Sequence, residues 1–340
     1  MVSVGLSPAV AVLGAGAWGT ALALHLAGLG RAVRLWTWRP EHAERLRNER
    51  ENAEFFAGYP LPPGVEPTAD LAQALTGVEA VIVVVPTPAV RSTLSAAAPL
   101  FGAEALLILA SKGIEIASRM LLTEVVGDVL GAGRADAAVA LSGPSFAQEV
   151  ARGLPTNLVA ASRAAEAALA AQRLLAGDRV RVYTSDDPVG VEVGGSLKNV
   201  IAIAAGASDG LGFGHNTRAA LITRGLAEMA RLAVAKGGST LTLAGLAGLG
   251  DLVLTATAEL SRNRTVGFEL GRGRQLADVL GGLRHVAEGV TTARSAHDLS
   301  EQLGVELPIC SEVYRVLYEN KPVDEAVREL LLRPPGKEWR

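Results

Sequence analysis

The sequence has only one cysteine, Cys310, among 340 residues, so no disulfide can form within one chain. Chains without disulfides are typical of a reducing compartment, and we therefore predict a cytoplasmic protein. Aromatic residues are also scarce, at 4% of the chain, so alanine, leucine, valine and glycine must fill the core. Cys310 follows Leu307 and Ile309, and we interpret it as a small buried apolar residue.

A strong charge of either sign is absent as well. The formal net charge is −3 and the isoelectric point is about 6.0, which excludes the basic footprint of a nucleic-acid-binding protein. The five histidines are scattered along the chain without the spacing of metal ligands, so we predict no metal site.

The first 24 residues carry no charged side chain and have the hydropathy of a signal or membrane segment. A signal peptide needs positive charge ahead of its apolar stretch, and no arginine or lysine occurs before Arg31. Pro8 and several glycines also interrupt the run. We therefore predict a core strand followed by a packed helix here, and no membrane insertion.

A glycine-rich motif, Gly14-Ala15-Gly16-Ala17-Trp18-Gly19, lies between the first apolar run and the first helical pattern. This is the G-x-G-x-x-G turn of dinucleotide-binding proteins. Gly14 allows the tight turn, Gly16 lets the backbone approach a pyrophosphate, and Gly19 lets the helix pack closely on the strand. The helix N-terminus supplies N–H groups and a positive dipole end. We therefore predict a dinucleotide site here, with Ala17 and Trp18 against the cofactor.

The end of the second predicted strand, Ala32–Thr37, bears on the choice of cofactor. NAD-preferring proteins place an acidic residue there to bind the ribose 2′-hydroxyl. This chain has Trp38 and Arg39 instead, with no acidic residue before Glu41. Arg39 is suited to the 2′-phosphate of NADP, and its alternative role is that of a surface arginine at the end of a strand. We assign Trp38 and Arg39 to the cofactor site and predict that the protein uses NADP and tolerates NAD.

Apolar runs alternate with helical patterns through the first half of the chain. The strands predicted after the second are Val78–Val85, Leu106–Ala110, Ala137–Leu141, Leu158–Ala161 and Arg179–Tyr183, whereas Asn52–Pro67 is predicted to be a loop. Continuous apolar strands of this kind are typical of a parallel sheet with helices on both faces. We therefore predict an α/β fold, with a Rossmann-type doubly wound parallel sheet over residues 1–186. Ligands bind such sheets beyond the carboxyl ends of the strands.

After Asp186-Asp187-Pro188 the strand pattern disappears, and residues 187–340 are predicted to form an all-α domain for substrate binding and catalysis. The first helix of this domain contains Lys198 in a largely apolar stretch. Burial would lower the pKa of this lysine toward the range in which it can both donate and accept a proton. The alternative is a lysine whose ammonium group reaches water from the end of the helix.

Further motifs accompany this lysine. They are Ser111-Lys112-Gly113-Ile114-Glu115, Leu141-Ser142-Gly143-Pro144-Ser145-Phe146-Ala147, Gly195-Ser196-Leu197-Lys198-Asn199-Val200, Gly248-Leu249-Gly250-Asp251-Leu252 and Ser261-Arg262-Asn263-Arg264. Together with the glycine turn, in this order over nearly the whole chain, they resemble the bacterial NAD(P)-dependent glycerol-3-phosphate dehydrogenase family. One departure is Ala17, where the family usually has a small polar residue. It removes at most one side-chain hydrogen bond, because backbone N–H groups do most of the anion binding.

The resemblance implies reversible hydride transfer between NAD(P)H and dihydroxyacetone phosphate, which gives sn-glycerol 3-phosphate for phospholipid synthesis. It implies that Lys198 is the general acid and base and that Lys112 polarises the substrate carbonyl. Asp251 would orient Lys198 or bind a substrate hydroxyl. The other residues implied are Gly143, Ser145, Ser261, Arg262 and Asn263 for the substrate, and Lys112, Ala147, Arg262, Val286 and Glu288 for the cofactor, with Glu288 on its adenosine side. A homodimer is the expected assembly.

Several alternatives stay open at this point. Asp251 could cap a helix, and Glu288 could be a solvated residue that opens one. The enzyme could be a related hydroxyacid dehydrogenase that binds a carboxylate, because such enzymes loosely share the Gly-Ser-x-x-Lys-Asn order; the Ser261-Arg262-Asn263 run favours a phosphate. A non-catalytic nucleotide sensor is disfavoured, because Lys198 and the hydrogen-bond donors for a phosphate are both present.

Overall fold

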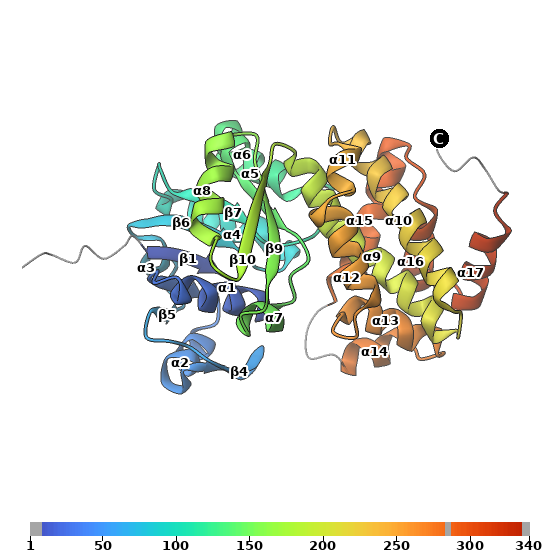
Figure 1. Cartoon of the computed structure of the whole chain (residues 1–340), viewed down its shortest axis with the longest axis horizontal. Helices are drawn as coiled ribbons and strands as arrows, with labels where there is room; N and C mark the ends of the chain where they lie inside the picture. The colour runs from blue at the N-terminus through green and yellow to red at the C-terminus, as the bar shows by residue number, and fades with distance from the viewer. Residues whose placement is uncertain (1–8, 283–286, 335–340) are drawn as a thin grey trace, which may run out of the picture.

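The computed structural model describes residues 9–282 and 287–334. Figure 1 shows two parts side by side: a sheet covered by helices, and a group of helices alone. The sheet has eight strands in the order β10-β9-β8-β7-β6-β1-β2-β5. These are β1 (Ala9–Leu13), β2 (Val33–Trp36), β5 (Val65–Thr68), β6 (Val78–Val83), β7 (Leu106–Leu109), β8 (Val139–Ser142), β9 (Thr156–Ala161) and β10 (Val180–Ser185).

The predicted α/β class with a Rossmann-type sheet is confirmed, with one difference in strand direction. All neighbouring strands are parallel except β8 and β9, which are antiparallel. The connection between these two strands, residues 143–155, contains only the short helix α7 (Ala147–Ala151). A parallel crossover usually contains a full helix packed on the sheet, whereas α7 has only five residues, and the chain returns in the opposite direction.

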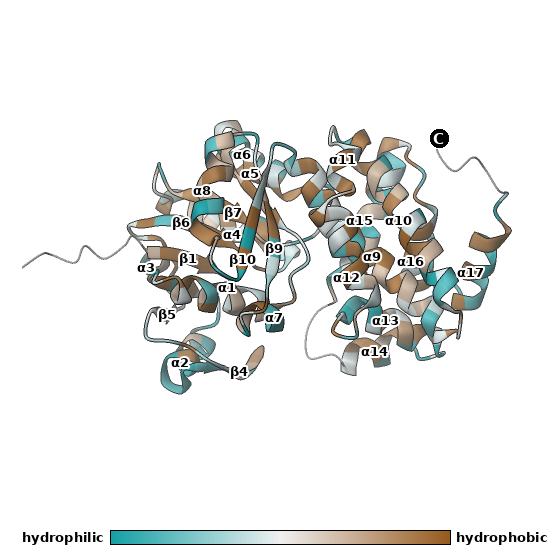
Figure 2. Ribbon diagram, in the orientation of Figure 1, coloured by the Kyte–Doolittle hydropathy of each residue, from teal (hydrophilic) through white to brown (hydrophobic). Residues whose placement is uncertain are grey.

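Helices cover both faces of this sheet. They are α1 (Ala17–Gly28), α2 (Pro40–Glu49), α3 (Leu71–Leu75), α4 (Thr87–Ala97), α5 (Leu122–Leu130), α6 (Ala132–Ala137), α7 and α8 (Ala165–Leu175). Along β1, Val10 and Val12 belong to one buried cluster, whereas Ala11 and Leu13 belong to another. The strand is therefore apolar on both faces, as its uninterrupted apolar run predicts. Figure 2 shows the hydrophobic strands and the more hydrophilic surface of α2.

The prediction of a loop over Asn52–Pro67 is wrong. This stretch contains β4 (Phe56–Pro60), which pairs with β3 (Glu51–Asn52), and the start of β5, which pairs with β2. The prolines and glycines here hide the strand pattern. Pro67 is compatible with β5 because β5 is the last strand at one edge of the sheet, where one missing N–H donor costs little.

The second part of the structure is entirely helical among the described residues from 188 onward. Its elements are α9 (Pro188–Gly210), α10 (His215–Ala235), α11 (Thr240–Leu243), a π-helical turn (Leu246–Gly250), α12 (Asp251–Thr257), α13 (Arg262–Gly271), α14 (Leu276–Gly282), α15 (Glu288–Leu303), α16 (Pro308–Tyr318) and α17 (Val323–Leu332). The long helix α9 lies at its centre, packed against α10, α12, α13 and α15 (Figure 1). By length and composition α9 could cross a membrane, but 89% of its most apolar window is buried inside the protein, as expected for a core helix.

Helices α9 and α13 approach each other too closely for side chains at their crossing. A Cβ atom on Gly267 would lie 1.9 Å from the backbone oxygen of Ile203, and one on Gly206 would lie 2.0 Å from that of Arg264. Glycine at both positions therefore lets the two backbones touch, which holds α13 against the helix that carries Lys198.

Gly267→Ala is expected to destabilise the protein by about 2–3 kcal/mol, because the added methyl group has only backbone to displace. The matched control is Gly28→Ala on α1, where nothing lies within 4 Å of the new atom. That variant should be neutral or slightly stabilised. Urea denaturation of both variants makes the comparison, and equal midpoints would contradict the packing argument.

Candidate active site

The glycine turn between β1 and α1 has the geometry of a pyrophosphate cradle. Gly14 has a φ of 127°, and a Cβ atom there would lie 2.8 Å from the backbone of Val84. A Cβ atom on Gly19 would lie 1.9 Å from the oxygen of Gly14, so the helix packs directly on the turn. Gly16 caps α1 without a side-chain hydrogen bond, and the space around its Cβ position is open. The first N–H groups of α1, beginning at Ala17, are thus suited to bind an anion.

Trp18 and Ala147 lie beside this turn. Trp18 is partly buried against the apolar cluster on one face of the sheet, and its indole Nε1 is buried without a hydrogen-bond partner among the described residues. Ala147 begins α7, which packs against α1. An unpaired buried N–H group next to the turn fits a polar group of a bound dinucleotide.

Beyond the carboxyl end of β2, Trp38 and Arg39 have different environments. Trp38 is 74% exposed. Arg39 Nη2 donates to Glu54 Oε1 at 2.6 Å, and its guanidinium group lies 5.5 Å from the ring centre of Phe55. Glu54 also accepts a hydrogen bond from Arg45. Glu54 is not among the residues predicted for the site, because it lies 15 residues from Arg39 in a stretch interpreted as a loop.

At the junction of the two parts, two lysines share one carboxylate. Lys198 lies in the middle of α9, Asp251 begins α12, and Lys112 follows β7. Lys198 Nζ donates to Asp251 Oδ1 at 2.5 Å, and Lys112 Nζ donates to Asp251 Oδ2 at 2.9 Å. The exposed fractions of the side chains are 9% for Lys198, 14% for Lys112 and 1% for Asp251. The alternative of a solvated Lys198 is therefore excluded, and Asp251 binds lysines rather than capping a helix.

Burial controls the acidity of this cluster. It lowers the pKa of Lys198 to about 8, with the charge of Lys112 adding to the effect and Asp251 opposing it. Burial would raise the pKa of Asp251, but the two lysines outweigh burial and hold that pKa below its usual value. The cluster thus contains one ionised carboxylate and one amine whose pKa lies near 8.

The loop after β8 lies against the same lysines. Gly143 has a φ of 125°, and its backbone oxygen accepts a hydrogen bond from Lys112 Nζ at 3.4 Å and one from Ser145 Oγ at 3.0 Å. On α9, a Cβ atom at Gly195 would lie 2.9 Å from Ser142 Oγ and 3.6 Å from Lys112 Cδ. Glycine at position 195 therefore lets this loop and Lys112 reach the helix that carries Lys198.

The Ser261-Arg262-Asn263 run begins α13, and its side chains have separate tasks. Ser261 Oγ caps the helix by accepting from the N–H of Arg264. Asn263 Nδ2 donates to Asn199 Oδ1, and Asn263 Oδ1 accepts from the N–H of Gly289, both at 2.9 Å. The amide of Asn263 therefore ties α13 to α9 and α15 through one donated and one accepted hydrogen bond. Arg262 is exposed, whereas Ser261 and Asn263 are buried.

Glu288 lies close to the lysine cluster. It begins α15, and its carboxylate is close enough to Arg262, Lys112 and Lys198 to interact with their charges. Burial raises the pKa of Glu288, against the effect of these cations. Helix α15 packs on α9, which carries Lys198, and the contact of Glu288 with the adenosine side of the cofactor stays a prediction. Val286, also predicted to contact the cofactor, lies outside the described residues.

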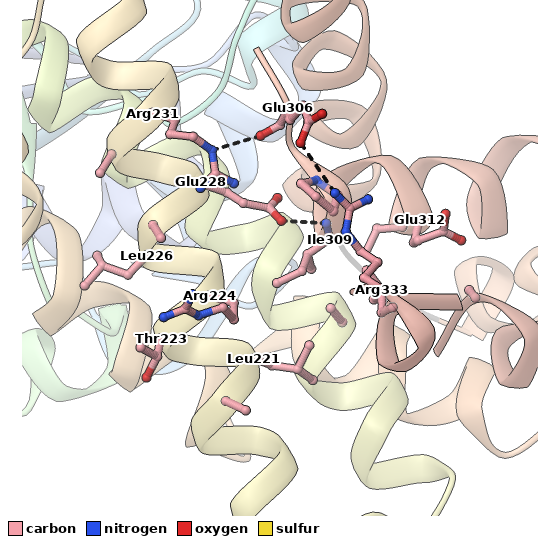
Figure 3. A pocket seen from close by; sticks show the side chains of 18 of the residues that line it. Leu221, Thr223, Arg224, Leu226, Glu228, Arg231, Glu306, Ile309, Glu312 and Arg333 are labelled. Atoms are coloured by element: carbon pink, nitrogen blue, oxygen red, sulfur yellow. Dashed lines mark hydrogen bonds and ion pairs between the residues drawn. The ribbon is translucent and has the colours of Figure 1, made fainter. Parts of the chain in front are cut away.

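A broad, mainly apolar groove occupies another part of the helical region, between α10, α16 and α17 (Figure 3). Glu228 lies within it, where its two carboxylate oxygens accept from the N–H groups of Ile309 and Cys310. Neither the lysines nor Asp251 line this groove. It contains none of the predicted site residues.

Comparisons with known proteins identify one family. The family described as NAD-dependent glycerol-3-phosphate dehydrogenase matches in two parts, its N-terminus over residues 9–168 and its C-terminus over residues 187–328. The glycerol-3-phosphate dehydrogenases [NAD(P)+] of Geobacter metallireducens and Geobacter sulfurreducens are 53% and 52% identical to the chain. These matches cover 97% and 96% of this chain and 98% of each relative.

A solved structure is also similar over nearly its whole length. The crystal structure of glycerol-3-phosphate dehydrogenase from Coxiella burnetii has a TM-score of 0.92 and 42% sequence identity, and the match covers 96% of this chain and all of that one. Together with the two-part family match, this shows that the chain belongs to the NAD-dependent glycerol-3-phosphate dehydrogenase family and is an oxidoreductase that uses NAD(P) to act on a CH–OH group.

Proposed function

We propose that the protein interconverts dihydroxyacetone phosphate and sn-glycerol 3-phosphate, with Lys198 as general acid and base and Lys112 as the group that polarises the carbonyl. The observation that carries the proposal is the buried Lys198–Asp251–Lys112 cluster at the junction of the two parts. Residues 1–186 would hold the dinucleotide and residues 187–340 the substrate.

A nicotinamide cofactor held at the glycine turn would supply the hydride for the middle carbon of the ketone, or accept it from the alcohol. As the ketone is reduced, its oxygen gains negative charge, and Lys198 transfers a proton to it from its ammonium form. The charge of Lys112 stabilises this oxygen as it develops. In the reverse direction, neutral Lys198 removes the hydroxyl proton. Asp251 binds the Nζ atoms of both lysines and so positions them before the reaction begins. The two side chains therefore need little rearrangement during proton transfer.

The substrate phosphate is assigned to the start of α13. Arg262 is exposed there and offers a planar guanidinium group that can bind a phosphate with two hydrogen bonds. The N-terminus of α13 adds a positive dipole end. Ser261 and Asn263 would act mainly by positioning this helix, since the hydroxyl of Ser261 caps it and the amide of Asn263 is bonded to α9 and α15.

The test is an assay of NADPH and NADH oxidation with dihydroxyacetone phosphate, compared with 2-oxo and 3-oxo acids. Rapid oxidation with the phosphate alone is the expected result. Comparable or faster turnover of an oxo acid would instead favour the related hydroxyacid dehydrogenases and would remove the phosphate role of Arg262.

The preference for NADP depends on Arg39. Arg39→Glu is expected to lower kcat/KM for NADPH by roughly 10- to 100-fold, because hydrogen bonds between charged groups contribute about 1.5–3 kcal/mol. The value for NADH should fall much less, because NADH has no 2′-phosphate. Arg173→Glu, at an exposed position on α8, is the control for the change in net charge. Equal losses for the two cofactors would remove the reason to expect NADP use.

A cytoplasmic homodimer is the assembly and location proposed for the protein. Cys310 is a free buried thiol, as suits a reducing compartment. Leu331 and Leu332 on α17 are 68% and 75% exposed, and apolar surface of this kind commonly marks an interface. Light scattering on a sizing column should give twice the 35.1 kDa of one chain.

A further inference from the structure

We propose that Glu54 is a specificity-determining residue that keeps this enzyme able to use NAD as well as NADP. The inference rests on the proposed function, in that Arg39 is taken to lie at the ribose end of the cofactor. Glu54 belongs to the connection between β3 and β4, so only the fold brings it to the carboxyl end of β2.

The carboxylate of Glu54 joins two arginines. Its Oε1 accepts from Arg39 at 2.6 Å, and its Oε2 accepts from Arg45. Burial alone would raise the pKa of Glu54, but the hydrogen bonds from both arginines outweigh it and lower that pKa, so the group is ionised at neutral pH. The arginines on either side, at the start and in the middle of α2, hold it in one orientation.

The position of Arg39 is fixed from a second side. Its guanidinium group lies 5.5 Å from the ring centre of Phe55, and the rings of Phe55 and His42 pack in a T-shaped arrangement with their centroids 5.2 Å apart. His42 in turn shares hydrogen bonds with Thr37 and Asn52, and Asn52 donates to the backbone oxygen of Ala15 in the glycine turn. The cluster is therefore anchored to the pyrophosphate cradle.

In this cluster the positive charges favour NADP, whereas the negative charge favours NAD. The guanidinium groups of Arg39 and Arg45 carry two positive charges, and Glu54 carries one negative charge. A 2′-phosphate has a charge near −2, so it gains from the arginines but is repelled by Glu54 and competes with it for the same N–H donors. The 2′-hydroxyl of NAD is neutral and can donate to a carboxylate. Glu54 thus supplies the acidic group that the end of β2 lacks.

The experiment compares Glu54→Gln with the wild-type protein in two measurements. These are kcat/KM for NADPH and NADH with dihydroxyacetone phosphate, and the Kd of each nucleotide from quenching of protein fluorescence. We expect the preference for NADPH over NADH to rise roughly tenfold in both measurements at low salt, and the change to shrink as ionic strength rises. The matched control is Glu49→Gln at the exposed far end of α2, which removes the same charge and should leave the preference unchanged.

Arg45→Gln tests the same balance with the opposite sign. Arg45 is half exposed, so the substitution should not disturb folding, and it leaves Glu54 paired with Arg39 alone. NADPH binding should weaken by roughly tenfold, with NADH binding little changed.

An unchanged cofactor preference in Glu54→Gln, or the same change in Glu49→Gln, would overturn the inference and leave the proposed reaction standing. Failure of the wild-type protein to reduce dihydroxyacetone phosphate would instead overturn the proposed reaction. The Kd values would still decide the role of Glu54 in that case, because they require no turnover.

Discussion

Lys198→Ala is expected to lower kcat for the reduction of dihydroxyacetone phosphate by about 10²- to 10⁴-fold, the usual contribution of a general acid. The Kd of NADPH should change little, because Lys198 belongs to α9, whereas the glycine turn lies between β1 and α1. Steady-state kinetics and nucleotide titration measure the two quantities. Lys198→Met, which retains more of the side-chain volume, should lose as much activity and separates the chemical effect from a packing defect.

The pH dependence provides a second measure of the same role. The pKa of Lys198 is about 8, so its protonated fraction falls as pH rises through that value. The kcat/KM for ketone reduction should therefore decrease above about pH 8, and that for alcohol oxidation should increase over the same range. The residual activity of Lys198→Ala should not show this decrease in kcat/KM for ketone reduction above about pH 8. Near-normal turnover in Lys198→Ala, or an unaltered pH profile, would contradict the assignment.

Asp251→Asn should move that pH profile as well as lower activity. Without the carboxylate, Lys112 and Lys198 repel each other, and the ion pair that raised the pKa of Lys198 is lost. The pKa of Lys198 therefore falls further, and the alkaline limb of ketone reduction moves to lower pH. Removing one partner of a buried ion pair also destabilises the fold, by about 3–5 kcal/mol. The loss should be largest while both lysines are protonated and should shrink as rising pH deprotonates one of them.

The helical part of the protein contains a matched control for this experiment. Asp209 is likewise a buried carboxylate shared by two cations, Arg218 and Arg264. Asp209→Asn should therefore destabilise the fold, but it should leave the pH profile of activity unchanged, because arginine stays protonated and the site is not involved. If both aspartate variants shifted the profile alike, the role of Asp251 would reduce to stability. Thermal unfolding and pH–rate profiles of the two variants make the distinction.

Local sequence patterns were sufficient to predict the first strand–turn–helix unit and the α/β class of the fold. The apolar run Ala9–Leu13, the glycine turn and the helix behind it form as predicted, because each depends on residues within one strand–turn–helix unit. The apolar surroundings of Lys198 along α9 likewise predicted a buried amine. Over Asn52–Pro67 local patterns failed, because β5 is held by pairing with β2, and prolines obscure its alternation.

The residue types and their positions in the sequence already indicated a dinucleotide-binding turn, a lysine with a lowered pKa and a group of hydrogen-bond donors for a phosphate. Only tertiary packing decided that Asp251 binds both Lys198 and Lys112, which lie 53 and 139 residues from it along the chain. The same is true of Glu54 beside Arg39, of Glu288 beside the lysines and of Asn263 between α9 and α15. Ion pairs and hydrogen bonds act over a few ångströms in space, and for residues in different elements that distance is set by how the elements pack, which local sequence patterns do not specify.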